Sequence, residues 1–238
     1  MPAPKISRVR QALRALSTVL IVSGALLIAD AGLTLVWQEP ISAVYAKLQQ
    51  RRLAGQLNDL ENLTDLQLRA LQRLRTENRR VAFLARLLRR QSEPGDAIGR
   101  IKIKRIGTSY VVVQGTKAGD LRTGPGHYAD TPFPGIHGTV AIAGHRTTYL
   151  APFRKLNQLH KGDLITLDMP YAKFTYRTQR KPQIVDPGAY EYVTSRKRYD
   201  RLALTACHPL YSAKQRVVVF AKLIRVTPRG RARIQPSL

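Results

Sequence analysis

The chain has 238 residues, with 40 Lys and Arg against 15 Asp and Glu, which gives a formal net charge of +25. Hydrophobic residues make up 44% of the chain, enough for a buried core, so a disordered polar chain is excluded. The single cysteine excludes an intramolecular disulfide framework and a zinc site built on cysteine pairs. It leaves one thiol, which is either structural or reactive.

The N-terminal part of the chain has the pattern of a membrane anchor. Residues 1–15 are basic, and residues 16–37 form an apolar run whose one charge is Asp30. This run matches the ~20 residues that a helix needs to cross a bilayer. A removable signal peptide is the alternative, but its apolar region spans only ~7–15 residues. We therefore expect an uncleaved transmembrane anchor over 16–37, and a small excess of basic residues before it favours a cytoplasmic N-terminus.

Residues 38–92 are predicted to form a helical stalk. Mostly apolar residues recur there at alternating steps of four and three, which places them on one seam of a helix: Leu53, Leu57, Leu60, Leu71, Leu74, Val81, Ala85 and Leu88. Thr64, Gln67 and Asn78 interrupt this seam. We expect a solvated helix or a helical hairpin that packs on itself or on the next domain, and a dimerising coiled coil is the alternative.

A second domain is expected over residues 93–228. The turn-forming sequence SEPGD at 92–96 marks its start, and short strand-like runs follow. These predicted strands occupy residues 98–106, 110–114, 139–144, 163–169, 173–178, 183–186, 201–206 and 216–226. Eight short strands without a long helical period predict a mainly β domain that is closed or sandwiched. Residues 229–238 are expected to be a basic C-terminal tail.

Three chemically useful residues stand at the ends of predicted strands. Cys207 closes one strand, because Pro209 cannot continue a ladder; His145 ends another, and Arg216 opens the last. A nucleophilic thiol, an imidazole that carries protons and a cation for the oxyanion are what a cysteine acyl transferase needs. Each residue alone is weak evidence, since lone cysteines are often small buried hydrophobes, His145 also fits a surface histidine, and Arg216 is one of many basic residues.

The other histidines fit a catalytic or metal-binding role poorly. His208 is next to Cys207, and neighbours on a strand point to opposite faces, so we do not expect it to be the base. His127, His137 and His160 lie in turn-rich segments. The five histidines lack a recurrent ligand spacing, so we expect no metal site.

Two segments resemble the sortases, the membrane-anchored cysteine transpeptidases of Gram-positive bacteria. TPFPGIHGTVAIAGHRTTYLAPFRKLNQLHKGDLITL at Thr131–Leu167 is similar to the family's histidine region. LALTACHP followed by KQRVVVFAKL, within Leu202–Leu223, is similar to its cysteine and arginine strands. The resemblance covers about residues 98–226 and implies a closed eight-stranded sortase-type β-barrel with short helices. An L,D-transpeptidase would carry its histidine within a few residues of the cysteine.

Details of these segments are most similar to the class E sortases of actinobacteria. GHRTTY and the Cys-His-Pro sequence carry this likeness, which implies a preference for a Leu-Ala-x-Thr-Gly sorting signal over Leu-Pro-x-Thr-Gly. The chain departs from the family pattern at Ala203 and Ala206, where threonine is usual beside the thiol. It has no Asp-Pro-aromatic lid motif and few acidic residues, so we expect no calcium dependence and no cofactor.

The resemblance implies a two-step acyl transfer. The Cys207 thiolate would cleave a C-terminal sorting signal between Thr and Gly, with His145 as acid and base and Arg216 at the oxyanion. An amine from a peptidoglycan precursor would then resolve the thioester. The implied partners are secreted proteins with a sorting signal, an amine acceptor and the cell membrane, with the catalytic domain extracellular. Candidate substrate contacts are Thr147, Tyr149, Thr205 and His208, and Tyr149 has the alternative of packing on Pro152 and Phe153.

A second function class follows from the charge alone. A +25 chain tethered to a membrane fits a non-catalytic module that binds nucleic acid or an anionic polymer. The basic residues are spread along the whole chain, however, and no helix-turn-helix, zinc finger or aromatic-interleaved motif accompanies them. We therefore expect no nucleic-acid partner.

Overall fold

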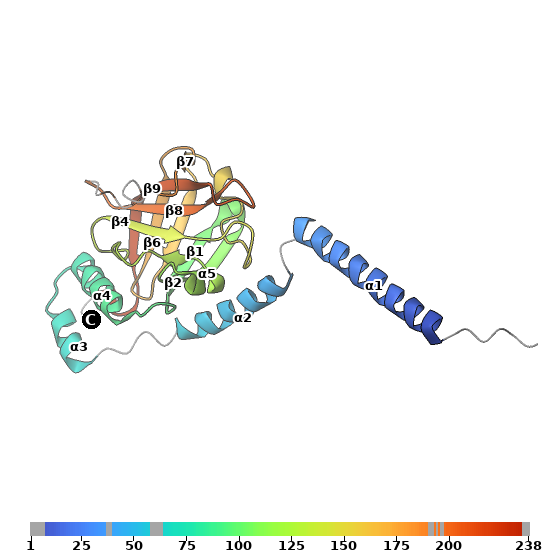
Figure 1. Ribbon diagram of the computed structural model, residues 1–238. Helices are drawn as coiled ribbons and strands as arrows, with labels where there is room; N and C mark the ends of the chain where they lie inside the picture. Colours follow the sequence, from blue (N-terminus) through green and yellow to red (C-terminus); the bar gives the residue numbers. More distant parts are fainter. Residues whose placement is uncertain are drawn as a thin grey trace, which may run out of the picture. The chain divides into compact units, whose positions relative to one another are not determined.

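The computed structural model describes residues 8–36, 40–57, 64–189, 193, 195 and 198–234 (Figure 1). The chain divides into two compact units, Met1–Pro40 and Ile41–Leu238. Residues 1–7 of the predicted basic N-terminus, Trp37 at the end of the predicted anchor and residues 235–238 of the predicted tail lie outside the described residues.

The first unit contains one long apolar helix. Helix α1 spans Arg8–Val36, and its stretch from Arg10 to Gly32 has a mean hydropathy of 2.0. At 1.5 Å per residue this stretch measures roughly 35 Å, which exceeds the ~30 Å hydrocarbon core of a bilayer. The helix is therefore consistent with a single-pass membrane anchor.

The second unit is built on a closed β-barrel. Its strands are β1 (Ala97–Ile103), β2 (Thr108–Gln114), β3 (Gly126–His127), β4 (Thr139–Ala143), β5 (Leu164–Asp168), β6 (Ala172–Thr178), β7 (Gln183–Val185), β8 (Arg201–His208) and β9 (Gln215–Pro228). Eight of them form the ring β6-β5-β1-β2-β3-β4-β8-β9, which the β6–β9 pairing closes. The predicted fold class, a mainly β closed eight-stranded barrel, is confirmed.

Membership of the ring differs from the predicted set of strands. Strand β3, which the sequence pattern missed, has only two residues and bridges β2 and β4. Strand β7 was predicted, but it pairs only with β9 and lies outside the ring. A two-residue strand is too short to show any alternation of apolar and polar residues, so no sequence pattern could reveal it.

The barrel interior follows the alternation of side chains along its strands. In β8, Leu202, Leu204 and Ala206 belong to the main hydrophobic core, while Ala203 belongs to a separate cluster on the other face of the sheet. Because Cys207 continues the series from Ala203, its side chain is on that other face. The thiol is therefore outside the barrel core.

Two helices of the predicted stalk pack against the barrel. Helix α3 spans Asp65–Gln72 and α4 spans Glu77–Gln91 (Figure 1). The seam residues Leu71, Val81, Ala85 and Leu88 are buried in the same hydrophobic cluster as the strand residues of the barrel interior. The hydrophobic seam thus faces the barrel, and the segment 41–92 belongs to the same compact unit.

The polar residues that interrupt the seam mark helix ends. Thr64 caps α3 in a capping box with Gln67, and Thr76 caps α4 by accepting from Arg79 N. Such caps satisfy backbone N–H groups that have no partner inside the helix. The predicted stalk segment thus contains separate helices rather than one.

Helix α2 (Pro40–Gln56) docks on β2 through one glutamine. The Gln50 side chain accepts from Val111 N at 2.6 Å and donates to Val111 O at 3.1 Å and to Thr123 O at 2.8 Å. Leu53 packs beside it in a small cluster with Val111 and Val113. Because β3 pairs with β2 only at Val113 and Gln114, the amide of Gln50 supplies the partner that Val111 lacks at this edge.

Short elements complete the unit. Helix α5 spans Ala118–Thr123, and the 3-10 turns are η1 (Lys104–Ile106), η2 (Leu156–Gln158) and η3 (Gly230–Ala232). The described part of the predicted tail lies against α4: Ala232 is fully buried, and Arg80 donates to Arg233 O at 3.0 Å.

Candidate active site

The three predicted catalytic residues lie on or directly after strands that pair with one another. In the parallel pair of β4 and β8, Ala143 is opposite Thr205, and Gly144 N donates to Thr205 O at 3.0 Å. His145 lies two residues beyond Ala143, and Cys207 lies two residues beyond Thr205, so both follow the same end of this strand pair. In the antiparallel pair of β8 and β9, Cys207 is directly opposite Arg216. Residues opposite each other in a sheet project from the same face, so thiol and guanidinium share that face.

The surface next to the thiol is apolar. Ala141, Ala203, Val218 and Phe220 form a buried cluster on the face of the sheet that carries Cys207, and Val193 packs on it from the segment between β7 and β8. The buried Arg201 holds this segment, since its Nη2 donates to Ser195 O at 3.1 Å and to Ser195 Oγ at 2.9 Å. Cys207 itself is partly exposed at the end of this surface.

His145 has the environment of a neutral imidazole. Burial lowers its pKa below the usual value, and the positive charge of Arg122 on α5 lowers it further. Its Nε2 atom is buried and has no hydrogen-bond partner among the described residues. The ring of Tyr149 lies against the imidazole, with 5.3 Å between ring centroids. A buried ring nitrogen without a partner can form a hydrogen bond with a substrate or with a neighbouring thiol.

The loop after His145 has a strained backbone. Tyr149, Leu150 and Ala151 have φ angles of 50°, 65° and 41°, in the left-handed region that non-glycine residues rarely adopt. Contacts from the barrel hold the loop: Thr108 Oγ1 donates to Pro152 O at 2.9 Å, and Tyr110 Oη donates to Leu150 O at 3.2 Å. These contacts thus hold the loop in a backbone conformation that its residues rarely adopt, and they keep the ring of Tyr149 against the imidazole.

Arg216 is turned toward the β8–β9 hairpin. Its Nη1 donates to Ala213 O at 2.8 Å and to Gln215 O at 2.9 Å. Among the described residues, no hydrogen bond joins the side chains of Arg216, Cys207 and His145. Both bonds of the guanidinium use Nη1, so donation from Nη2 to a bound oxyanion would require neither of them to break.

Arg146 is a buried cation that the sequence analysis did not single out. It is only 4% exposed, and its Nη1 donates to Cys207 O at 3.3 Å and to His208 Nδ1 at 3.0 Å. Its Nε and Nη2 donate to Arg154 O, and Nη2 also donates to Asn157 Oδ1 at 2.9 Å. Its position directly after His145 could have pointed to a role in the site. The chain has forty basic residues, however, so the sequence alone did not distinguish this arginine from the others.

The four candidate substrate contacts occupy different positions. Thr147 and Tyr149 are half-buried in the loop after His145. Thr205 is buried on the same face as Cys207, with its Oγ1 2.9 Å from the hydroxyl of Tyr128. Tyr128 is a second residue of this face that the sequence did not indicate, because it follows a turn-rich segment. His208 has its Nδ1 bound by Arg146.

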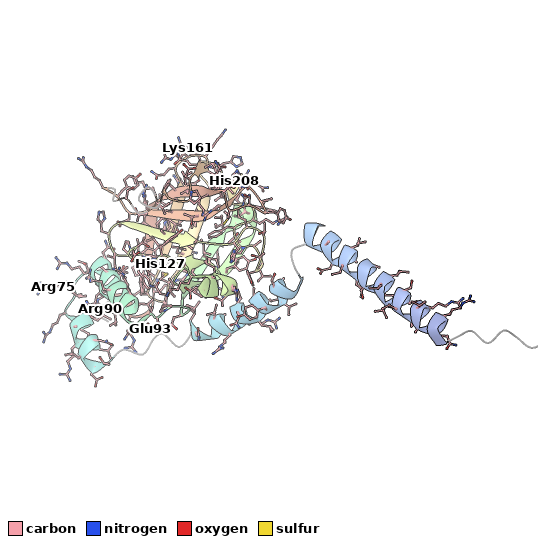
Figure 2. The ribbon with its side chains drawn as sticks, in the orientation of Figure 1. Arg75, Arg90, Glu93, His127, Lys161 and His208 are labelled. Carbon is pink, nitrogen blue, oxygen red and sulfur yellow. The ribbon has the colours of Figure 1, made fainter. Side chains whose placement is uncertain are left out.

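His127 is a core histidine, and Figure 2 shows it well apart from His208. It is fully buried, with Nδ1 2.9 Å from Gln114 Oε1 and Nε2 3.0 Å from Thr131 Oγ1. Burial lowers the pKa of His127 to about 4, with a smaller contribution from Arg89. Of the remaining histidines, His137 is paired with Asp200 at 2.6 Å. Within the described ranges, no cluster of three His, Cys, Asp or Glu side chains could hold a metal ion.

A closed β-barrel with a thiol, an imidazole and a guanidinium at neighbouring strand ends defines a candidate cysteine enzyme, and comparisons with known proteins place the chain in a family. Residues 101–224 match the family model described as "Sortase domain". The chain belongs to the sortase family.

Individual relatives agree with this assignment. Sortase D of Bacillus subtilis is 35% identical over 135 residues, which cover 56% of this chain and 66% of the relative. Sortase SrtE1 of Streptomyces coelicolor is 26% identical over 164 residues, covering 59% of this chain and 44% of the relative. The chain thus spans less than two thirds of the length of either relative.

Solved structures share the fold. Sortase E from Streptomyces avermitilis has a TM-score of 0.53 and 31% identity, covering 57% of this chain and 93% of that chain. A Clostridium perfringens Sortase D5 transpeptidase has a TM-score of 0.59 and 22% identity, covering 74% of this chain and 99% of that chain.

Proposed function

We propose that this protein is a cysteine transpeptidase that cleaves a C-terminal sorting signal between Thr and Gly and transfers the upstream part to an amine. The observation that supports the proposal is the strand register, in which Cys207 is opposite Arg216 and the strand that leads to His145 pairs with the cysteine strand up to Thr205. Membership of the sortase family supports it.

The proposed first step forms a thioester. The Cys207 thiolate attacks the carbonyl carbon of the Thr–Gly bond, and the C–N bond breaks as the His145 imidazolium gives its proton to the leaving amine. Arg216 donates hydrogen bonds to the oxyanion of the tetrahedral intermediate. In the second step an acceptor amine attacks the thioester, His145 takes the amine proton, and the thiolate is released.

The environment of His145 limits how much enzyme is ready to react. The mechanism needs His145 charged while Cys207 is ionised, yet burial and Arg122 lower the pKa of His145. The lowered pKa reduces the share of enzyme in which His145 is charged at neutral pH. Turnover then depends on groups that stabilise this fraction.

The proposed substrate is a class E type signal, Leu-Ala-x-Thr-Gly, with Leu-Pro-x-Thr-Gly as the alternative. The likeness to sortases of both D and E types supports this range. The proposed clients are secreted proteins, and the proposed acceptor is an amine of a peptidoglycan precursor. Helix α1 supports a location in the cell membrane. In the proposed orientation the N-terminus is cytoplasmic and the barrel is extracellular.

The test is a mass-spectrometric assay of the full chain in detergent. Peptides with either signal are offered together with a glycine amine. We expect cleavage between Thr and Gly that is lost in Cys207→Ala, and a loss of about 10²–10⁴-fold in His145→Ala. His160→Ala is the matched control, because that exposed histidine lies outside the site, and it should retain wild-type activity. Cleavage that persists in Cys207→Ala would exclude the proposal.

A further inference from the structure

The guanidinium of Arg146 lies where two parts of the proposed site meet. On one side it bonds to the end of β8, at Cys207 O and His208 Nδ1. On the other side it bonds to Arg154 O and to Asn157 Oδ1, near and within η2. Since Arg146 follows His145 directly, these bonds fix the histidine segment and the cysteine segment relative to each other.

All acceptors of Arg146 are neutral. They are two main-chain carbonyls, an amide oxygen and a ring nitrogen, and within the described residues Arg146 forms no ion pair with a carboxylate. A buried cation without a counter-ion is costly. Burial and the charge of Arg154 lower the pKa of Arg146, and the ionised form of Cys207 opposes this change. The ionised form of Cys207 thus favours the charged form of Arg146, whose Nη1 lies 3.3 Å from the Cys207 carbonyl oxygen.

The bond to His208 also occupies one of its ring nitrogens. A guanidinium has donors only, so His208 Nδ1 accepts this bond. His145, whose Nε2 has no partner among the described residues, is left as the histidine beside Cys207 that can take up a proton for the leaving group.

We infer that Arg146 is a positioning residue of this site: it joins the cysteine strand to the histidine loop and supplies a buried counter-cation for the Cys207 thiolate. The inference rests on the proposed function, in which that thiolate is the nucleophile. Arg146 touches the main chain of Cys207 and no reacting atom, so it acts through the thiol and through His208.

Other charged and titratable groups surround the thiol and share its electrostatic field. They include His145 after β4, Tyr149 in the loop that follows, Arg154 before η2, Asp186 after β7, His208 on β8, Tyr211 in the β8–β9 hairpin, Arg216 on β9 and Arg122 on α5. The arginine and tyrosine side chains among them are exposed or partly exposed. Arg146 differs in being almost fully buried, where charge interactions are least screened.

The test uses Asn157→Asp in the full chain. This variant keeps Arg146 and its bonds but places a carboxylate where an amide oxygen now lies 2.9 Å from Nη2. The new carboxylate forms an ion pair with the cation and offsets its field at the thiol. Because residue 157 is exposed and its charge is screened, we expect the midpoint of the Cys207 alkylation rate against pH to rise by a few tenths of a unit, which is about twofold less thiolate at a fixed pH below the midpoint. The thermal unfolding midpoint should stay level or rise.

Gln158→Glu is the matched control. It makes the same charge change one position along η2, at an exposed residue with no bond to Arg146, and it should leave the alkylation midpoint unchanged. Two further variants remove or keep the charge itself. Arg146→Gln should raise the midpoint as Asn157→Asp does. Arg146→Lys should give a smaller shift than Arg146→Gln, because lysine restores the positive charge but not the planar guanidinium that bonds several acceptors at once.

A folded Asn157→Asp protein with a wild-type alkylation midpoint would overturn the inference. An equal shift of the midpoint in Gln158→Glu would also overturn it, because any added surface charge would then have the same effect. Alkylation needs no peptide turnover, so the result is independent of the proposed function. A shifted midpoint in a protein that cleaves neither signal peptide would retain the inference about the thiol while the transpeptidase assignment fails.

Discussion

Gly144 connects β4 to His145 under the ring of Phe153. A Cβ atom at this position would lie 2.5 Å from Phe153 Cδ2, which no real contact allows. The ring is fully buried, so it cannot move aside without cost. The absence of a side chain at Gly144 thus allows the chain to pass close to Phe153 and sets where the imidazole emerges.

We therefore expect Gly144→Ala to displace His145 and to lower peptide cleavage at least 10²-fold, since a shift of about 1 Å at a reacting group has effects of that size. Turnover in the mass-spectrometric assay measures this. Gly119→Ala on α5 is the matched control, because a Cβ there meets nothing within 4 Å and the variant should behave as wild type. Equal activity of the two variants would contradict the expected role of Gly144.

The pH profile of cleavage should respond to Arg122. This arginine lowers the pKa of His145, so Arg122→Gln should raise that pKa and enlarge the imidazolium fraction at any pH above it. The acidic limb of kcat/KM should move to higher pH, by a few tenths of a unit because Arg122 is exposed and screened. Arg177→Gln removes an equally exposed charge on β6 and should not move the limb. An acidic limb that moves down in Arg122→Gln would refute this assignment.

Sequence reasoning reached the three proposed catalytic residues but missed the groups that hold them. Cys207, His145 and Arg216 could be found because each closes or opens a run of alternating residues, which is a local pattern. Arg146 could not be identified as buried, because its contact with Cys207 joins residues 61 positions apart. Tyr128 was missed for the same reason, since only the fold brings it to Thr205.

At the level of elements, the interrupted seam in residues 38–92 shows how polar residues divide a helical pattern. Thr64 and Gln67 interrupt the apolar seam, and together they form the capping box that begins α3. Four of the predicted seam residues, Leu71, Val81, Ala85 and Leu88, are buried in the same cluster as the residues of the barrel interior. Sequence periodicity indicates which side of a helix is buried, but the partner depends on distant segments.

Helix α2 depends on Gln50 for its docking, and Gln50→Ala should weaken it. The variant leaves Val111 N and O and Thr123 O without their side-chain partner, which should lower the free energy of unfolding by about 1–3 kcal/mol. Urea unfolding of the full chain in detergent measures the loss. Gln56→Ala, at an exposed position of the same helix, should unfold as wild type does. If both variants unfold alike, Gln50 does not hold α2.

For the whole molecule, His127 should make stability depend on pH. Its pKa is about 4 in the folded chain against an ordinary value of 6.5, so between these values the unfolded chain binds more protons. The contribution of His127 to the free energy of unfolding therefore has its highest value above pH ~6.5. It falls as the pH drops toward 4, by about 3 kcal/mol in total.

The slope of stability against pH isolates this contribution. His127→Gln should lose less stability than wild type between pH 7 and 4.5, whatever its stability at pH 7, because the titrating group is gone. His160→Gln removes an exposed histidine and should keep the wild-type slope. Parallel slopes in wild type and His127→Gln would show that the buried imidazole does not titrate as expected.

The apolar span, the alternating strands and the residues at their ends are local properties, so they could be derived from the order of amino acids. Pairing of β6 with β9, the bridging strand β3 and the cation Arg146 beside Cys207 join segments far apart in the chain. Such contacts form only when the barrel closes and water leaves its rim, because burial then obliges each polar group to find a partner. The tertiary structure alone therefore determined how the thiol, the imidazole and Arg146 are held together.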